Sequence, residues 1–200
     1  MKGGFITFEG LDGAGTTTQT GMLVNKLKNI GHSAQFTGEP TERPIGVLIR
    51  QILKGQKPFD RKALALLFAA DRLDHCETLI RPLVNRGFMV ISDRYIASSL
   101  AYQVEDAPMD WVVKINEFAI PPDLVIFLKV SPEIAMKRVE KRGSDREIFE
   151  KLEFQQRVMQ NYLTAIEPLP NKQKLVVDGT MSKESIHDII MKRVGQQFSI

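Results

Sequence analysis

The sequence contains very little cysteine and no long apolar run. Cys76 is the single cysteine among 200 residues, so an intrachain disulfide and a thiolate metal cage are both excluded. No stretch approaches the roughly 18 apolar residues that cross a bilayer. The apolar part of the N-terminal MKGGFITFEG is too short and too interrupted for a signal peptide. We therefore expect a cytoplasmic protein that has no membrane partner.

An excess of one charge is also missing. The chain carries 27 Lys and Arg against 24 Asp and Glu, which leaves a formal net charge of +3. So small a charge gives no reason to expect a nucleic-acid partner, and we expect none. The three histidines, His32, His75 and His187, are scattered without the spacing of metal ligands. Hydrophobic residues make up 43% of the chain, which is ordinary for a globular protein, and the length suits a single domain over residues 1–200.

Short apolar stretches alternate with longer helical patterns along the chain. Strands are predicted at residues 4–9, 33–38, 87–93, 124–130 and 174–178. Helices are predicted at residues 16–30, 45–53, 61–86, 109–119, 132–142, 148–166 and 183–194. The near-continuous apolar run at 124–128 is typical of a parallel strand buried under helices on both faces. This alternation predicts an α/β protein with a five-stranded parallel sheet, whose ligands bind beyond the carboxyl ends of the strands.

The loop after the first predicted strand has the glycine spacing of a phosphate-binding loop. Gly10 and Gly15 match G-x-x-x-x-G-K-[ST], and an apolar strand and a helical pattern stand on either side. Glycines let successive backbone N–H groups turn inward to phosphate oxygens, and Thr17 occupies the place of the hydroxyl that binds Mg²⁺. Thr16 stands where the motif has lysine. The alternative interpretation is a tight strand-to-helix turn that binds nothing.

Two more segments pair residues at helical spacing. Phe68 and Arg72 are four residues apart, so a ring and a guanidinium share one helix face and can hold a flat base. The alternative is a core Phe beside a surface Arg. Ser99 and Gln103 show the same spacing and can read a base edge together.

Charged residues follow the third predicted strand. Asp93 and Arg94 stand at its carboxyl end, where ligands of such sheets bind. Asp93 can orient Mg²⁺ or its waters, and Arg94 can hold a phosphate with two hydrogen bonds. The alternative is a helix-capping Asp with a surface ion pair.

A basic stretch from Lys137 to Arg146 ends a predicted helix at Gly143. Arg138, Arg142 and Arg146 recur every four residues around this break. Such a segment suits a flap that closes over phosphates, and we place this lid at about residues 138–152. A solvated basic surface is the alternative interpretation, because lysines at a helix C-terminus also favour the helix dipole.

Taken together, these motifs resemble the thymidylate kinase family over nearly the whole chain. The matching strings are FEGLDGAG at 8–15, EP at 39–40, IGVLIR at 45–50, LLFAADR at 66–72, SDRY at 92–95, SSLAYQ at 98–103 and PDLVIFL at 122–128. The basic lid, together with glycine rather than arginine in the phosphate loop, resembles the bacterial-type branch of that family. The resemblance implies a P-loop nucleoside monophosphate kinase fold with a lid, and a homodimer.

The resemblance also implies roles for the residues that match the motifs of the family. ATP would contact the phosphate loop at residues 10–17, which are Gly10, Leu11, Asp12, Gly13, Ala14, Gly15, Thr16 and Thr17. The acceptor dTMP would contact Glu39, Arg50, Phe68, Arg72, Asp93, Arg94, Ser99, Tyr102 and Gln103. Thr17 and Asp12 would be nearest to Mg²⁺, and the catalytic residues would be Asp12, Arg94, Arg142 and Arg146.

Within the acceptor set the implied roles differ. Phe68 would stack on thymine and Arg72 would hydrogen-bond it. Tyr102 would close on the deoxyribose, while Arg50 and Arg94 would grip the dTMP phosphate. The implied reaction moves the γ-phosphoryl group of ATP to dTMP and gives dTDP and ADP.

Two departures from the family pattern keep other functions open. Thr16 replaces the lysine of the loop, and Gly38 stands where many relatives have arginine. A non-catalytic nucleotide-binding protein is one alternative function. A deoxynucleoside kinase that phosphorylates a 5′-hydroxyl is another, although it would need no arginines for an acceptor phosphate.

Overall fold

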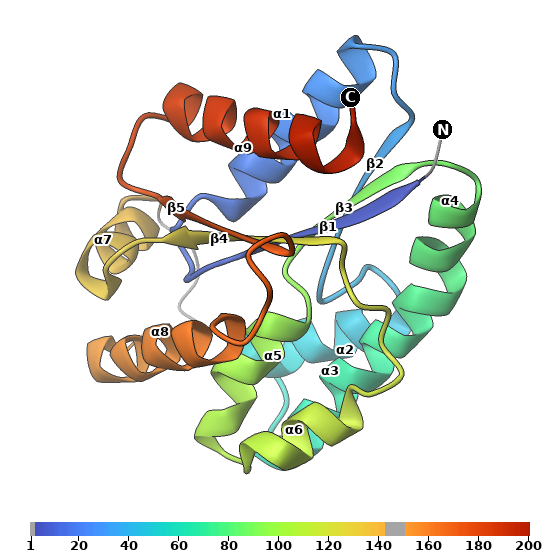
Figure 1. Cartoon of the computed structure of the whole chain (residues 1–200). Coiled ribbons are helices and arrows are strands. Elements are labelled where there is room, and N and C mark those ends of the chain that lie inside the picture. The colour runs from blue at the N-terminus through green and yellow to red at the C-terminus, as the bar shows by residue number, and fades with distance from the viewer. Residues whose placement is uncertain (1–2, 143–150) are drawn as a thin grey trace.

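The computed structural model describes residues 3–142 and 151–200, and in that part of the chain one parallel sheet organises the fold (Figure 1). The strand order is β2-β3-β1-β4-β5. The strands are β1 Gly4–Glu9, β2 Ala34–Gly38, β3 Met89–Asp93, β4 Leu124–Lys129 and β5 Lys174–Asp178. All four strand pairings are parallel, which confirms the predicted five-stranded α/β sheet.

Helices cover both faces of this sheet, as parallel strands require. The helices are α1 Thr16–Asn29, α2 Pro44–Leu53, α3 Arg61–His75, α4 Arg81–Asn85, α5 Ile96–Tyr102, α6 Met109–Ile115, α7 Pro132–Arg142, α8 Leu152–Ile166 and α9 Lys183–Phe198. Figure 1 shows α1 and α9 above the sheet, with α2, α3, α5, α6 and α8 below it. The carboxyl ends of the strands point toward α7, the end at which ligands of such sheets bind.

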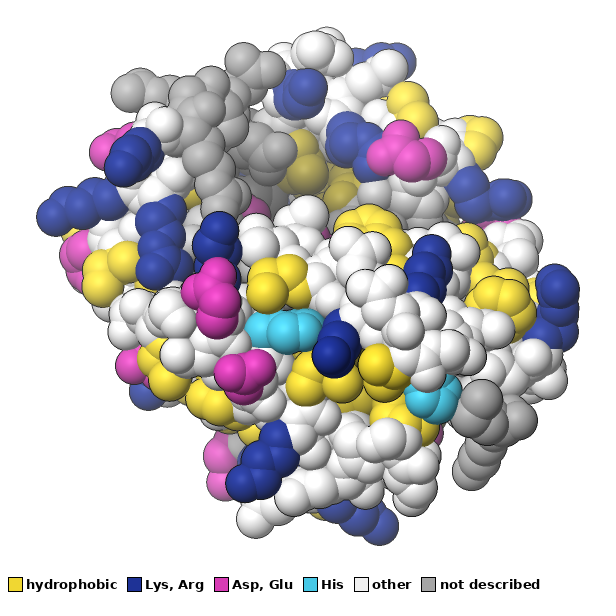
Figure 2. Space-filling model, turned by 90° about the horizontal axis from the view of Figure 1, so that it is seen from above, with side chains coloured by type: hydrophobic (Ala, Val, Ile, Leu, Met, Phe, Trp, Pro, Cys, Tyr) yellow, Lys and Arg dark blue, Asp and Glu magenta, His cyan; other side chains and the backbone are white. Residues whose placement is uncertain are grey.

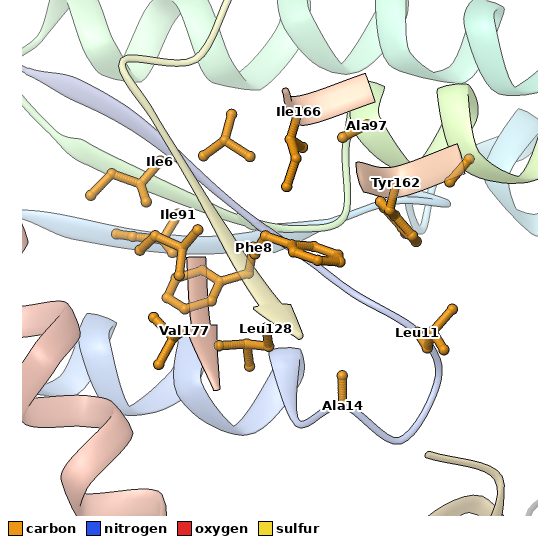
Figure 3. Close-up of a cluster of buried hydrophobic side chains, with 14 of the residues drawn as sticks. Ile6, Phe8, Leu11, Ala14, Ile91, Ala97, Leu128, Tyr162, Ile166 and Val177 are labelled. Carbon is orange, nitrogen blue, oxygen red and sulfur yellow. The ribbon is translucent and has the colours of Figure 1, made fainter. Parts of the chain in front are cut away.

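The hydrophobic core lies on both sides of β1. Ile6 and Phe8 from β1 are fully buried, and because they are two residues apart in the strand they point to the same face of the sheet, whereas Phe5 belongs to a separate buried cluster (Figure 3). Tyr162 of α8 contributes its ring to this core beside Phe127, with 5.2 Å between the ring centroids. The core therefore packs against the end of β1, the strand from which the following loop starts.

The predicted helix at residues 61–86 is wrong as a single element. The chain leaves α-helical geometry for the π-helical turn η1, Cys76–Ile80, before α4 begins. In that turn the Arg81 N–H donates to the Cys76 carbonyl, five residues back. Pro82 follows at once and has no N–H to continue the regular pattern, which is the physical reason for the change.

Other boundaries move by a few residues. The helix predicted at 109–119 ends at Ile115, where the Asn116 side chain bonds back to the Val112 carbonyl at 2.8 Å. The helix predicted at 148–166 is described from Leu152, because residues 143–150 lie outside the described part. Within the described ranges no helix is long and apolar enough to span a bilayer. On the face above α1 and α9, Lys and Arg side chains are interspersed with Asp and Glu (Figure 2).

Candidate active site

The loop between β1 and α1 has the backbone that a phosphate cradle needs. Gly13 and Gly15 have φ values of 87° and 99°, a left-handed conformation that other residues rarely adopt. Gly15 precedes the first residue of α1, and a Cβ placed on it would meet open space. The first N–H groups of α1 have no partner within the helix, and such groups after a left-handed glycine turn are suited to bind phosphate oxygens.

Thr16 adds no charge to this cradle. Its side chain is turned inward and is only 6% exposed. Its carbonyl accepts a hydrogen bond from Thr20 Oγ1 at 2.8 Å, one helical turn further on. The positive charge that lysine brings to such loops must therefore come from elsewhere.

The end of β3 meets the start of α1 at the mouth of the loop. Thr17 Oγ1 donates a short hydrogen bond to Asp93 Oδ2, across 76 residues of sequence. A hydroxyl and a carboxylate are oxygen ligands of the kind that Mg²⁺ prefers. Asp12, which we predict beside the metal together with Thr17, lies 2.5 Å from the guanidinium of Arg94. Among the described residues no group of three acidic, His or Cys side chains forms a metal cage by itself.

Arg94 is held in an unusual backbone conformation. Its φ is 72°, which costs a residue with a side chain about 1–2 kcal/mol. Two hydrogen bonds keep it there, because its N–H donates to Phe8 O at 2.8 Å and its carbonyl accepts from Ser92 Oγ at 2.8 Å. This backbone turns the Arg94 side chain toward the phosphate loop, where it reaches Asp12.

Behind Arg94 lies a buried acid that the sequence reasoning missed. Glu9 is 1% exposed, and its Oε2 accepts a hydrogen bond from Ser98 Oγ at 2.6 Å. Burial raises the pKa of Glu9 to about 7, although the Ser98 bond and the charges of Arg94 and Arg72 oppose the rise. Its place in the FEGLDGAG string was the one available signal.

Arg72 is a fully buried cation. It is 1% exposed, and its Nη2 lies 2.7 Å from Glu39 Oε2. Its Nη1 donates to Ser99 Oγ at 2.9 Å and also to Asn116 Oδ1. Its Nε is buried and has no hydrogen-bond partner among the described residues.

Helix α3 also anchors the turn that carries Glu39. His75 Nδ1 lies 3.0 Å from Glu39 Oε1, and its Nε2 lies 2.7 Å from Thr37 Oγ1. Asp71 accepts hydrogen bonds from the backbone N–H and the hydroxyl of Thr41, at 2.8 and 2.6 Å. Sequence reasoning missed both residues; their helical spacing from Phe68 and Arg72 was the signal that could have found them.

The predicted acceptor residues fall into two groups. Glu39, Arg50, Asp93 and Arg94 line one open cavity of about 610 Å³ next to the phosphate loop. Arg50 there donates to the carbonyls of Pro40 and Thr41, at 2.6 Å each. Ser99, in contact with Arg72, belongs to the second group.

The remaining members of the second group come from α3, α5 and η2, Gln103–Glu105. Phe68 is half-buried against the core, while Tyr102 and Gln103 are each 7% exposed. The Arg94 guanidinium lies 5.5 Å from the centre of the Tyr102 ring, so this residue connects the two groups. Gln103 Oε1 is buried without a hydrogen-bond partner in the described part of the chain.

The predicted lid is described only at its base. The side chain of Arg142 and residues 143–150, which include Arg146, lie outside the described residues. Arg138, one helical turn earlier in α7, donates to Gly13 O at 3.4 Å and to Gly179 O at 3.0 Å. The helix that leads into the lid is thus attached to the phosphate loop.

A glycine loop between a central parallel strand and a helix, with a threonine–aspartate pair at its mouth, defines a P-loop kinase. The model of the thymidylate kinase family matches residues 8–190, and the chain belongs to that family. It is therefore an enzyme, and its activity is the phosphorylation of dTMP with ATP as the donor.

Similar proteins named probable thymidylate kinase come from several archaea. One from Methanococcus maripaludis is 44% identical over 88% of this chain and 86% of its own length. Relatives from Thermococcus onnurineus and Pyrococcus horikoshii are 40% and 38% identical, over 95% and 97% of this chain and 96% and 97% of theirs. These archaeal relatives give no support to the bacterial-type branch.

Proposed function

We propose that the cavity beside the phosphate loop holds the phosphate of dTMP in line with the γ-phosphoryl group of ATP. The observation that carries this assignment is that Arg94 and Arg50 both line that cavity and that Arg94 also contacts Asp12 of the phosphate loop. An acceptor that already carries a phosphate needs cations to bind it, whereas a nucleoside would need a carboxylate base beside its hydroxyl. The two arginines of the cavity therefore favour dTMP over thymidine.

In this proposal each part of the chain contributes position or charge. Phosphoryl transfer needs in-line placement and neutralisation of the equatorial oxygens, and little covalent chemistry from the protein. The loop N–H groups at residues 10–17 hold the phosphates of ATP. Arg94 and Arg50 hold the acceptor phosphate, which is largely ionised at neutral pH and needs no base.

Mg²⁺ fits beside Thr17 and Asp93, whose oxygens already meet at the loop mouth. The ion, when bound, would neutralise charge on the β- and γ-phosphates. The ion pair with Arg94 keeps Asp12 near the acceptor side of the site. We expect Asp12 to release this arginine when the dTMP phosphate arrives.

For the base, we propose that Phe68 stacks on thymine and that the free Nε–H of Arg72 hydrogen-bonds it. Ser99, already in contact with Arg72, and Gln103, with its unpaired Oε1, complete the polar surface of this pocket. Tyr102 would then cover the deoxyribose. Buried polar groups without partners favour a ligand that satisfies them, because each unmet group costs about 1–3 kcal/mol.

The proposed lid, including Arg142 and Arg146, would bring the charge that Thr16 lacks. This role rests on the basic run at 137–146, and the assignment to a bacterial-type branch rests on that run together with glycine in place of arginine in the phosphate loop. A cytoplasmic location and a homodimer likewise remain predictions. Phe118, 72% exposed just after α6, is an apolar side chain that such a dimer could cover.

The test is a coupled ADP-release assay on the purified chain, with dTMP and thymidine as alternative acceptors. We expect turnover with dTMP, dependent on Mg²⁺, and a far smaller kcat/KM with thymidine. Preference for thymidine would instead assign a deoxynucleoside kinase. ATP binding without turnover of either acceptor would assign the non-catalytic function.

A further inference from the structure

A chain of hydrogen bonds connects Glu9 to the arginine of the acceptor site. Ser98 of α5 stands between them, with its Oγ 2.6 Å from Glu9 Oε2 and 3.2 Å from Arg94 Nη1. Tyr162 of α8 closes the group, 2.7 Å from Ser98 Oγ and 3.0 Å from Arg94 Nη1. Four side chains from β1, the end of β3, α5 and α8 thus meet at one point.

The chemistry of these four side chains decides which atom donates in each hydrogen bond. A guanidinium only donates, so Arg94 Nη1 donates to both hydroxyl oxygens. Burial raises the pKa of Tyr162 well above its usual range, so its hydroxyl keeps a proton and can donate to Ser98. The Ser98 hydroxyl then has one proton left for Glu9 Oε2, its remaining contact. Every hydrogen bond therefore points from Arg94 toward the Glu9 carboxyl.

This arrangement occupies one side of the Arg94 guanidinium and leaves the other side for a ligand. Nη1 is committed to Ser98 and Tyr162, whereas Nη2 lies against the half-exposed carboxylate of Asp12. Asp12 is at the loop mouth and can be displaced by a phosphate. The Ser98–Tyr162 side is enclosed by the core and has no such freedom.

A contribution to the stability of the fold does not explain why position 9 is a glutamate. Its Oε1 is buried without a hydrogen-bond partner among the described residues, and a carboxyl taken from water with one oxygen unpaired destabilises a fold. An apolar side chain would fill the same place at less cost. A functional contact through Ser98 is the remaining explanation of its position.

We propose that Glu9 is a positioning residue for phosphoryl transfer, which through Ser98 holds the Nη1 side of Arg94 so that Nη2 faces the acceptor phosphate. The inference rests on the proposed binding of dTMP phosphate by Arg94. Glu9 itself touches neither substrate. Its effect is on geometry, and a misplaced group near the reacting atoms can lower rates by about 10²-fold.

The test compares Glu9→Leu, Glu9→Gln and Ser98→Ala in the dTMP assay, with the Kd for dTMP measured by calorimetry alongside. For Glu9→Leu and Ser98→Ala we expect kcat/KM for dTMP to fall about 10- to 100-fold, mostly in kcat, while KM for ATP changes less than twofold. Glu9→Gln should recover most of the activity, because its amide oxygen can still accept from Ser98. The double variant Glu9→Leu/Ser98→Ala should be no worse than Ser98→Ala alone.

Glu105 supplies the matched control. Its carboxylate also joins the α5 region to α8, through Asn161 Nδ2 at 2.8 Å and Arg157, but it does not contact Arg94. Glu105→Gln and Glu105→Leu should keep kcat/KM within about twofold of wild type, since they loosen the helix contact without touching the acceptor site.

Several results would overturn the proposal. They are wild-type kcat/KM in Glu9→Leu or Ser98→Ala, additive losses in the double variant, or an equal loss in Glu105→Leu. Wild-type protein that does not turn over dTMP would refute the proposed function instead, and the calorimetric Kd would then still report whether Glu9 and Ser98 act on phosphate binding. If Glu9→Leu does not fold, Ser98→Ala alone decides.

Discussion

Phe68 is the residue on which recognition of the base depends in our assignment. Phe68→Ala should raise KM for dTMP by about 5- to 150-fold, because loss of a base stack is worth roughly 1–3 kcal/mol. KM for ATP should stay within twofold. Leu66→Ala is the control, since Leu66 belongs to the same helix and is 49% exposed. Equal effects on both substrates would make Phe68 a packing residue only.

Glu9 also sets a pH dependence of stability. Its pKa is about 7 in the folded chain against an ordinary value of 4.5, so the folded state binds more protons than the unfolded state between these pH values. Stability from this group is therefore present below pH 4.5 and is lost as the pH rises through 7. A shift of this size corresponds to roughly 3 kcal/mol.

Glu9→Gln should abolish the loss of stability that wild type shows as the pH rises. Relative to wild type, the free energy of unfolding of the variant should rise by roughly 3 kcal/mol between pH 4 and pH 8. Urea unfolding at a series of pH values measures it, with Glu105→Gln as the control. A difference between variant and wild type that does not change with pH would show that Glu9 titrates normally. A more stable variant would also exclude unfolding as the cause of any lost activity.

At the scale of elements, the phosphate loop depends on how closely α7 approaches it. Gly13 has a left-handed φ, and a Cβ on it would overlap the carbonyl of Ala135 in α7. Gly13→Ala should therefore destabilise the chain and weaken ATP binding, because either the loop or α7 must move. The expected loss of stability is at least ~1 kcal/mol, the size of the backbone penalty alone.

Gly21, in the middle of α1, provides the opposite control. A Cβ there meets nothing within 4 Å. Gly21→Ala should stabilise the chain by about 0.5–1 kcal/mol, since alanine favours a helix interior. Thermal unfolding of both variants, with Kd for ATP by calorimetry, checks the pair. If Gly13→Ala were as stable as wild type and bound ATP normally, the close approach of α7 would not constrain the loop.

For the molecule as a whole, we predict that the lid supplies the positive charge that the phosphate loop lacks at Thr16. Arg142→Ala or Arg146→Ala should cut kcat by at least ~100-fold, because an arginine supplied to a phosphoryl transfer can be worth ~10³ in rate. Thr16→Lys should restore part of that loss. A double-mutant cycle in the dTMP assay measures the coupling. Additive effects, or lid variants with wild-type kcat, would disprove the compensation.

Much of the fold could be predicted from local patterns. The period of apolar residues and the glycine positions depend on near neighbours, so β1 and β5 begin and end at the predicted residues. The π-helical turn at 76–80 could not be predicted in this way, because Pro82 allows either an end or a distortion of the helix.

The sequence by itself determined the parallel sheet, the phosphate loop and, through the resemblance, the family, since each is a pattern of residues close along the chain. Only the tertiary structure decided which side chains meet. Thr17 contacts Asp93 and Ser98 contacts Glu9, across 76 and 89 residues, because β3 lies next to β1 in the sheet. An alternation of strands and helices along the chain is compatible with many strand orders, whereas these long-range contacts form only in a particular one. The burial of Arg72 and the cluster of polar side chains around Arg94 follow from that strand order. The spacing of residues along the chain could not predict them.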